Sequence, residues 1–201
     1  MQELKRTRTS FFDRNRFFIL LTGIMLGGVL IGSLAFCSMN DTTAGRVSFI
    51  AKGFIETRAK LSLSAIFVNT FLSSSGFLLL IFILGFSAVT QPIEILIPFF
   101  KGLGLGASLA QIYADSGIKG FMIILLLIVP CAIINSFGII IAVREAIRFS
   151  NIFTAKAISS ENGGGMKSIT KLYCIKFLVI EVIMIIGAAV DCICSFMFAG
   201  V

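Results

Sequence analysis

Residues 17–37, with the sequence FFILLTGIMLGGVLIGSLAFC, form an apolar run of 21 residues without a charge. An α-helix rises about 1.5 Å per residue, so this run is long enough to cross the ~30 Å hydrocarbon core of a bilayer. It is longer than the apolar core of a typical cleaved signal peptide, and further apolar sequence follows it. We therefore expect it to be retained as the first membrane span.

The rest of the chain has the same apolar character. Of its 201 residues, 57% are apolar and only 13% are charged, whereas soluble domains are about 45–50% apolar and about 25% charged. A soluble protein needs charged groups to cover the surface that faces water. The composition therefore excludes a soluble enzyme, a disordered chain and a disulfide-framed secreted domain. It indicates a polytopic membrane protein in contact with the lipid bilayer.

Several residue types that carry protein chemistry are missing or scattered. The chain has no His, which excludes His-based triads and His metal ligands. The five Cys show no CxxC spacing and lie in or beside apolar runs, so we expect buried thiols and no metal or cofactor. The net charge of +7 would suit a nucleic-acid binder. Because the basic residues lie at the ends of apolar segments, we interpret them as membrane orientation signals and expect no nucleic-acid partner.

Four further stretches are long and apolar enough to predict membrane-spanning helices. We place these spans at about residues 71–89, 92–114, 121–143 and 172–198. Together with residues 17–37 they predict an all-α integral membrane protein, a bundle of about five transmembrane helices that forms one polytopic domain over residues 1–201.

The polar connection at residues 38–60 separates the first two spans. Apolar residues recur along it at roughly helical spacing at Val47, Ile50, Phe54 and Leu61. This spacing predicts an amphipathic helix at the membrane surface. A short soluble helix packed on the loops is the alternative.

The third span is irregular. Glu94, Pro98 and Lys101 interrupt its apolar sequence, and three glycines follow within a few residues. Proline removes a backbone donor and crowds the preceding turn, so we expect this span to be kinked or broken in the middle. A re-entrant pair of half-helices is the competing interpretation.

The distribution of Lys and Arg predicts the orientation. Five basic residues precede the first span, and five more lie in a basic linker at residues 144–171. The opposite side receives four at residues 38–60 and one at residues 115–120, which gives ten against five. The side richer in basic residues is normally cytoplasmic. We therefore expect a protein with its N-terminus on the cytoplasmic side of the membrane and its C-terminus outside.

Small residues with GxxxG spacing occur in the first and third spans. The pairs are Gly23 with Gly27, Gly28 with Gly32, and Gly102 with Gly106. This spacing lets helix backbones approach closely. It predicts either packing within the monomer or contact with a partner helix, including self-association.

Five charged residues fall inside the predicted spans. Lys176 stands near the start of the last span, where its long side chain can reach the membrane surface. The other four are Glu94, Lys101, Glu181 and Asp191. A charge at the bilayer centre costs at least ~2.5 kcal/mol on insertion scales, so such residues are functional candidates. One interpretation is a polar seam that serves as an ion or proton path. The other is that each side chain reaches an interface or pairs across helices with Lys101 to fix the bundle.

No arrangement of residues indicates an enzyme. The sequence has no nucleophile beside a base, no glycine-rich phosphate loop after a strand and no paired acids on one helix face. We expect a protein without catalytic activity. An integral-membrane enzyme acting on lipids is a remote alternative.

The stretch from Lys101 to Pro130 resembles the stage II sporulation protein M family of small polytopic membrane proteins. The matching frame consists of Lys101, Gly102, Gly106, Gly117, Gly120, Phe121 and Pro130. Many family members carry a polar His or Gln after the proline. Here Cys131 stands in that place and Asn135 lies further along, so any role of that polar site is not carried over.

The resemblance implies a role that composition does not show. The family member of endospore formers is a membrane scaffold for engulfment of the forespore. It is thought to recruit two peptidoglycan-degrading proteins, stage II sporulation proteins D and P, to the sporulation septum. The resemblance thus implies a non-catalytic scaffold, and the intramembrane charges keep a transporter or channel component open as the rival function.

Overall fold

The computed structural model describes residues 11–38, 63–87, 89–158 and 164–199. Within them every regular element is a helix, and five helices are long and apolar enough to cross a membrane. The elements are α1 (Phe11–Cys37), α3 (Leu63–Leu84), α4 (Gln91–Ile123), the π-helical turn η1 (Ile124–Ile128), α5 (Val129–Ile158) and α6 (Gly164–Ala199). The prediction of an all-α bundle of five spans is confirmed. The predicted amphipathic helix at 38–60 lies outside the described residues.

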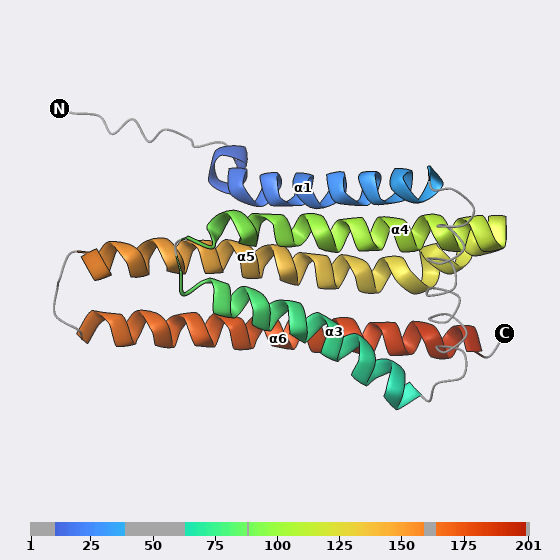
Figure 1. The fold of residues 1–201 in the computed structure, drawn as a ribbon. Coiled ribbons are helices and arrows are strands. Elements are labelled where there is room, and N and C mark those ends of the chain that lie inside the picture. The colour runs from blue at the N-terminus through green and yellow to red at the C-terminus, as the bar shows by residue number, and fades with distance from the viewer. Residues whose placement is uncertain (1–10, 39–62, 88, 159–163, 200–201) are drawn as a thin grey trace, which may run out of the picture.

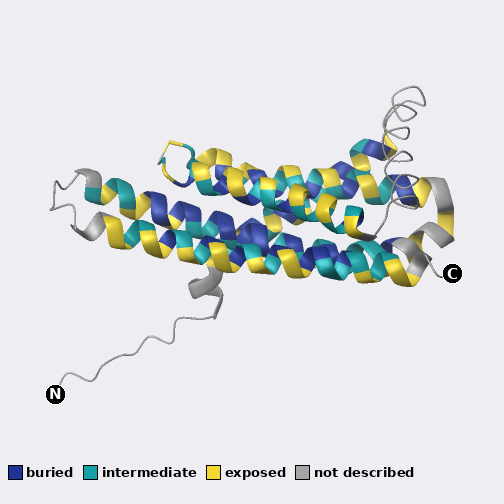
Figure 2. Cartoon of the chain, turned by 90° about the horizontal axis from the view of Figure 1, so that it is seen from below, coloured by how far each residue is buried: buried dark blue, intermediate teal, exposed yellow. Residues whose placement is uncertain are grey.

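Consecutive spanning helices run in alternating directions. As a result α1 begins at one end of the bundle and α6 ends at the other (Figure 1). Buried residues lie along the inner faces and exposed apolar residues along the outer faces (Figure 2). The core joins residues from all five spans, among them Leu21, Ile81, Ile97, Ile139 and Met184. The exposed apolar outer surface is the one that a lipid bilayer would cover.

The second span lies further toward the N-terminus than we predicted. The sequence placed it at residues 71–89, but α3 runs from Leu63 to Leu84. The prediction treated the polar residues before and around position 73 as too hydrophilic for a span. In the structure Thr70 and Ser75 donate hydrogen bonds to acidic side chains of α6, so their polarity is satisfied between helices.

A tight turn joins α3 to α4. The Thr90 hydroxyl donates to the carbonyl oxygens of Leu84 and Ser87, at 2.7 and 2.8 Å. The Thr90 carbonyl accepts from the amides of Ile93 and Glu94. Thr90 therefore satisfies groups at the end of one helix and the start of the next, and Pro92 stands where a helix N-terminus tolerates proline.

The third span is helical through its middle. Pro98 lies inside α4 without ending it, and the one non-helical residue is Gly117, with φ 54° and ψ −132°. This positive φ favours glycine over residues with a Cβ. The chain reverses there, so α4 crosses the bundle as one helix (Figure 1). The span is therefore not broken in its middle and the re-entrant alternative is wrong, whereas the kink that we expected there stays a prediction.

A π-helical turn precedes α5. It covers Ile124–Ile128, just before Pro130. Proline has no amide hydrogen to donate to the preceding turn, and its ring crowds the carbonyl four residues earlier. A wider turn accommodates both effects, which is a common origin of such irregularities.

The last two helices extend beyond the rest of the bundle. Their candidate spans, Leu126–Lys156 and Lys167–Met197, contain 31 residues each, whereas ~20 residues cross a bilayer. Together they protrude past the start of α4 (Figure 1). The predicted linker at 144–171 is thus mostly helix, because α5 continues to Ile158 and α6 begins at Gly164.

Candidate functional site

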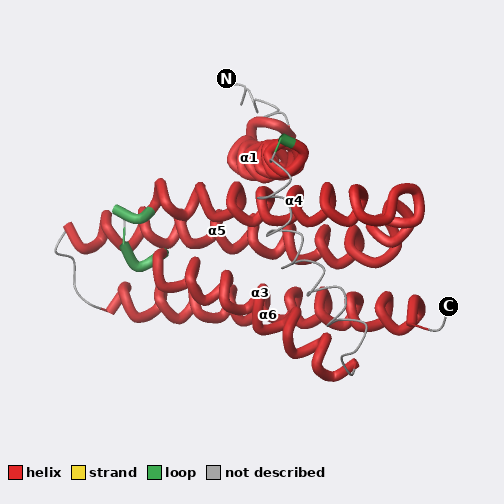
Figure 3. Tube along the Cα trace, turned by 45° about the vertical axis from the view of Figure 1, so that its right-hand side comes forward, coloured by secondary structure: helices red, strands yellow, loops and turns green. Residues whose placement is uncertain are grey.

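The closest contact between two helices joins α1 to α4. The two helices run in the same direction, because Met25 and Val29 of α1 meet Gly102 and Gly106 of α4 in the same order. In Figure 3, α1 is seen nearly along its axis while α4 and α5 still run across the view, so α1 crosses them at an angle. Angled crossings with glycine at the contact are a known mode of membrane helix packing.

Four of the predicted glycines form this crossing. A Cβ on Gly28 would overlap the carbonyl oxygen of Phe99, and one on Gly32 would overlap that of Leu103. From the other side, a Cβ on Gly102 or Gly106 would meet backbone atoms of α1. Backbone atoms cannot rotate away as side chains do. The pairs Gly28–Gly32 and Gly102–Gly106 therefore pack α1 on α4 within the monomer.

The remaining pair on α1 has a different environment. A Cβ on Gly23 or Gly27 would have no atom within 4 Å. Leu30 and Leu34 follow at helical spacing and are 64% and 68% exposed. We call the side of α1 formed by Gly23, Gly27, Leu30 and Leu34 the open α1 face. Nothing in the described part of the chain packs against its glycines.

Two of the predicted intramembrane charges lie between α3 and α6. The Thr70 hydroxyl donates to Asp191 at 2.6 Å, and the Ser75 hydroxyl donates to Glu181. Asp191 is buried, and Ser74 is buried beside these donors on α3. The polar residues of α3 and the acids of α6 thus form one interhelical seam, which we call the α3–α6 seam.

The other two charges lie on α4. Glu94 is completely buried, and its Oε2 atom has no hydrogen-bond partner in the described structure. The Lys101 ammonium lies 4.5 Å from the centre of the Phe77 ring, a cation–π contact with α3. The structure thus brings Glu181 and Asp191 onto one seam and leaves Glu94 and Lys101 apart from it.

The sequence analysis missed an aromatic cluster where α3, α5 and α6 meet. Tyr173 stacks on Phe149 and Phe82, with ring centres 4.0 and 5.1 Å apart, and contacts Phe86 and Phe177. Its hydroxyl donates to the Phe82 carbonyl at 3.0 Å, near the end of α3. The sequence offered one signal for this cluster: Tyr173 is one of only two Tyr residues in a Phe-rich chain, and it stands just inside the last predicted span.

The sequence analysis also missed the ion pair between Lys176 and Glu145. Their Nζ and Oε2 atoms lie 2.5 Å apart and join α6 to α5, three residues after Tyr173 along α6. The predicted linker at residues 144–171 includes Glu145, so the sequence did not indicate that Glu145 packs between helices.

The residues of the family frame are spread over the turn and its two flanking helices. Lys101, Gly102 and Gly106 lie along α4, and Gly117 forms the reversal. Gly120 and Phe121 follow in the last part of α4, and Pro130 lies at the start of α5 after the π-helical turn. Five of these positions have a structural role in the described residues. Lys101 contacts the Phe77 ring, Gly102 and Gly106 form the helix crossing, Gly117 has a positive φ, and Pro130 follows the π-helical turn.

These observations define the chain as a polytopic α-helical membrane protein with a glycine-lined helix crossing and a polar interhelical seam. The sequence matches no protein-family model, no curated protein and no solved structure.

Proposed function

We propose that the chain is a non-catalytic membrane scaffold that recruits single-span partner proteins through the open α1 face. One observation carries the proposal. Helix α1 holds two GxxxG pairs on different sides: one is packed on α4, and the other, Gly23 with Gly27, has no neighbour in the described residues. The packed pair demonstrates that glycines at this spacing support close helix contact in this chain. The free pair offers the same surface to a further helix.

The proposed partners are membrane-anchored peptidoglycan-degrading proteins, in the manner of stage II sporulation proteins D and P. The resemblance of the Lys101–Pro130 frame to the stage II sporulation protein M family supports this assignment, and so does the absence of a catalytic constellation in the sequence. We further propose that the N-terminus lies in the cytoplasm and the C-terminus outside, where enzymes acting on the wall work. In a spore former the place of action would be the septum.

A matched pair of variants tests the open α1 face. Gly27→Leu places a large side chain on the proposed docking surface. Gly76→Leu makes the same change on α3, where a Cβ also has no atom within 4 Å. We expect Gly27→Leu to lower co-purification of the partners at least several-fold from native membranes, and Gly76→Leu to leave it unchanged. Equal recovery of partners with Gly27→Leu and wild type would remove the proposal, provided both elute alike in size exclusion.

Transport is the second candidate function, favoured by Glu94. Its carboxyl group is fully buried, and one oxygen has no hydrogen-bond partner in the described structure, which lowers the stability of the fold. A residue kept at such a cost inside a membrane span is a functional candidate. Proteoliposome flux that disappears in Glu94→Gln and Asp191→Asn would establish transport. A scaffold does not transport ions. If the wild-type chain shows no flux and the partner proteins still co-purify with it, the scaffold is the correct function.

A further inference from the structure

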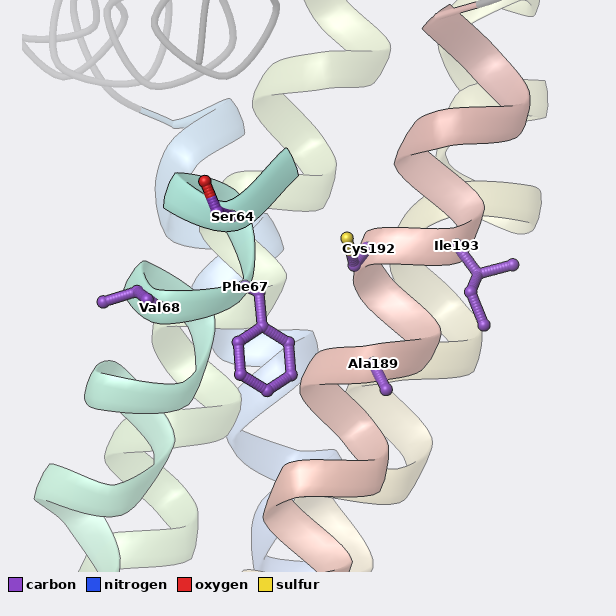
Figure 4. A pocket seen from close by; sticks show the side chains of 6 residues that line it. All are labelled: Ser64, Phe67, Val68, Ala189, Cys192 and Ile193. Carbon is purple, nitrogen blue, oxygen red and sulfur yellow. The ribbon is translucent and has the colours of Figure 1, made fainter. Parts of the chain in front are cut away.

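A crevice of about 380 Å³ lies between the first turns of α3 and the outer part of α6. Within the described part of the chain, its lining residues come from these two helices: Ser64, Phe67, Val68, Ala189, Cys192 and Ile193. Figure 4 shows the Phe67 ring on one side of the gap and Ala189 and Cys192 on the other. All six residues belong to candidate membrane spans, so the crevice lies at membrane depth.

The α3–α6 seam explains why the crevice is open at this place. Further along α3, the bonds from Thr70 to Asp191 and from Ser75 to Glu181 hold the two helices together. On the other side of that seam α3 diverges from α6 toward its own N-terminus (Figure 1). Phe67 stacks on Phe71 of the next turn, with ring centres 6.2 Å apart, and so is held as one wall.

We propose that this crevice binds one acyl chain of a membrane lipid, from the leaflet at the C-terminal end of the bundle. The crevice is continuous with the lipid-facing surface, because its rim residues Val68 and Ile193 are 56% and 59% exposed. Its lining is hydrocarbon apart from the Ser64 hydroxyl and the Cys192 thiol. Water does not fill an apolar space of this kind, since it would find almost no hydrogen-bond partners.

The size of the crevice supports this occupant. An apolar cavity of about 150 Å³ already accommodates a benzene molecule, so a space of about 380 Å³ can take a chain of several methylene groups. A transmembrane helix is much wider than an acyl chain, at about 10 Å with its side chains. The lining residues span only 64–68 on α3 and 189–193 on α6, between one and two turns of each helix, and this short crevice suits the narrower acyl chain.

Crevice-filling variants test the proposal by the number of retained lipids. Ala189→Phe fills the crevice, whereas Leu178→Phe places the same side chain three turns away at a lipid-exposed position of α6. We expect native mass spectrometry of the detergent-purified wild-type chain to show one tightly retained phospholipid. That lipid should be lost in Ala189→Phe and kept in Leu178→Phe. Absence of the lipid from the wild type, or its retention in Ala189→Phe, would overturn the proposal.

A fluorescence measurement tests lipid binding in the crevice independently, in case Ala189→Phe folds poorly. The chain contains no Trp, so Phe67→Trp introduces a single reporter into the crevice, and Leu72→Trp a reporter on the outer surface of the same helix. Phospholipids brominated on the acyl chain should quench Phe67→Trp, and adding Cys192→Phe should at least halve that quenching while leaving Leu72→Trp unchanged. Quenching of Phe67→Trp that does not respond to Cys192→Phe contradicts lipid binding. Disulfide-linked dimers through Cys192 alone would instead assign the crevice to a second copy of the chain.

Discussion

At the scale of single residues, the α3–α6 seam shows which groups Glu181 and Asp191 contact. Glu181 and Asp191 each accept a hydroxyl hydrogen bond from α3. Interhelical hydrogen bonds in membranes contribute modestly, since the unfolded helix also finds partners for its polar groups. The acids therefore fix the position of α3 against α6 more than they add to total stability.

Removing one donor from the seam should have a small, measurable effect. Thr70→Val deletes the hydroxyl that reaches Asp191 and keeps the shape of the side chain. We expect a loss of about 0.6 kcal/mol in unfolding free energy, with an upper bound of ~1.7 kcal/mol. Thr22→Val is the control, because the Thr22 hydroxyl donates to Phe18 of its own helix. Denaturant titration in detergent micelles measures the unfolding free energy of both variants. Equal losses of unfolding free energy in Thr70→Val and Thr22→Val would contradict an interhelical role for Thr70.

A second residue-scale prediction concerns Gly85 and Tyr173. A Cβ on Gly85 would overlap the Tyr173 hydroxyl and approach Ala146 at 3.1 Å. Gly85→Ala should therefore lower the unfolding free energy by about 1–3 kcal/mol, as overpacking does. Tyr173→Phe removes the overlapping atom, so the double variant should lose less than the sum of the single losses. Strict additivity in thermal unfolding would contradict the contact.

The sequence could identify the intramembrane acids Glu181 and Asp191 but not the residues that donate hydrogen bonds to them. Uncharged stretches reveal a buried Glu or Asp because it stands out from its surroundings. Thr70 precedes the predicted span at 71–89 and Ser75 falls inside it, and nothing in the hydropathy of either residue indicates a partner. Only the packing of α3 on α6 makes them donors. Tyr173 was hidden for a similar reason, since an aromatic residue among many Phe gives no signal of a cluster.

At the scale of helices, the pairing of α1 with α4 depends on glycines that meet backbone atoms. GxxxG spacing was evident in the sequence, and it predicted close approach. The two pairs on α1 follow one another directly in sequence, however, and each points to a different side of the helix. Which pair meets α4 depends on the rotation of α1 in the bundle, and this follows from the placement of Leu21, Met25 and Phe36 in the interior.

Two glycines of α4 provide a matched test of this crossing. A Cβ on Gly106 would overlap the Val29 carbonyl, whereas one on Gly104 would have no atom within 4 Å. Gly106→Ala should lower unfolding free energy by about 1–3 kcal/mol, because a backbone atom cannot yield as a side chain can. Gly104→Ala should have little effect or stabilise the helix slightly, since alanine favours helix over glycine. Thermal unfolding in detergent compares the stabilities of the two variants. A larger loss of stability in Gly104→Ala than in Gly106→Ala would contradict the crossing.

At the scale of the whole molecule, span number was easier to predict than span ends. Long uncharged runs identify membrane helices by length, as the five observed helices confirm. Their ends depend on where polar residues find partners. The basic residues after position 143 predicted the end of the fourth span, but α5 continues to Ile158, because Ala146, Phe149 and Ser150 are still buried against neighbouring helices.

The proposed orientation predicts which end of the bundle is accessible from outside the cell. In a chain whose native cysteines are replaced, a cysteine at the exposed position Ser38 should react with an impermeant maleimide in intact cells. A cysteine at exposed Lys167 lies at the other end and should react only after the membrane is permeabilised. Labelling with the opposite pattern would reverse the orientation and place the C-terminus in the cytoplasm.

The most direct test of the scaffold is cross-linking from the open α1 face in living cells. A photoreactive phenylalanine analogue at Leu30 probes that face, and the same residue at Leu79 probes a similarly exposed position on α3. We predict that Leu30 forms a discrete cross-link to a membrane-anchored peptidoglycan-degrading protein, identified by mass spectrometry, and that Leu79 does not. Cross-links from Leu30 to lipid alone, or the same protein products from both positions, would contradict recruitment through the open α1 face.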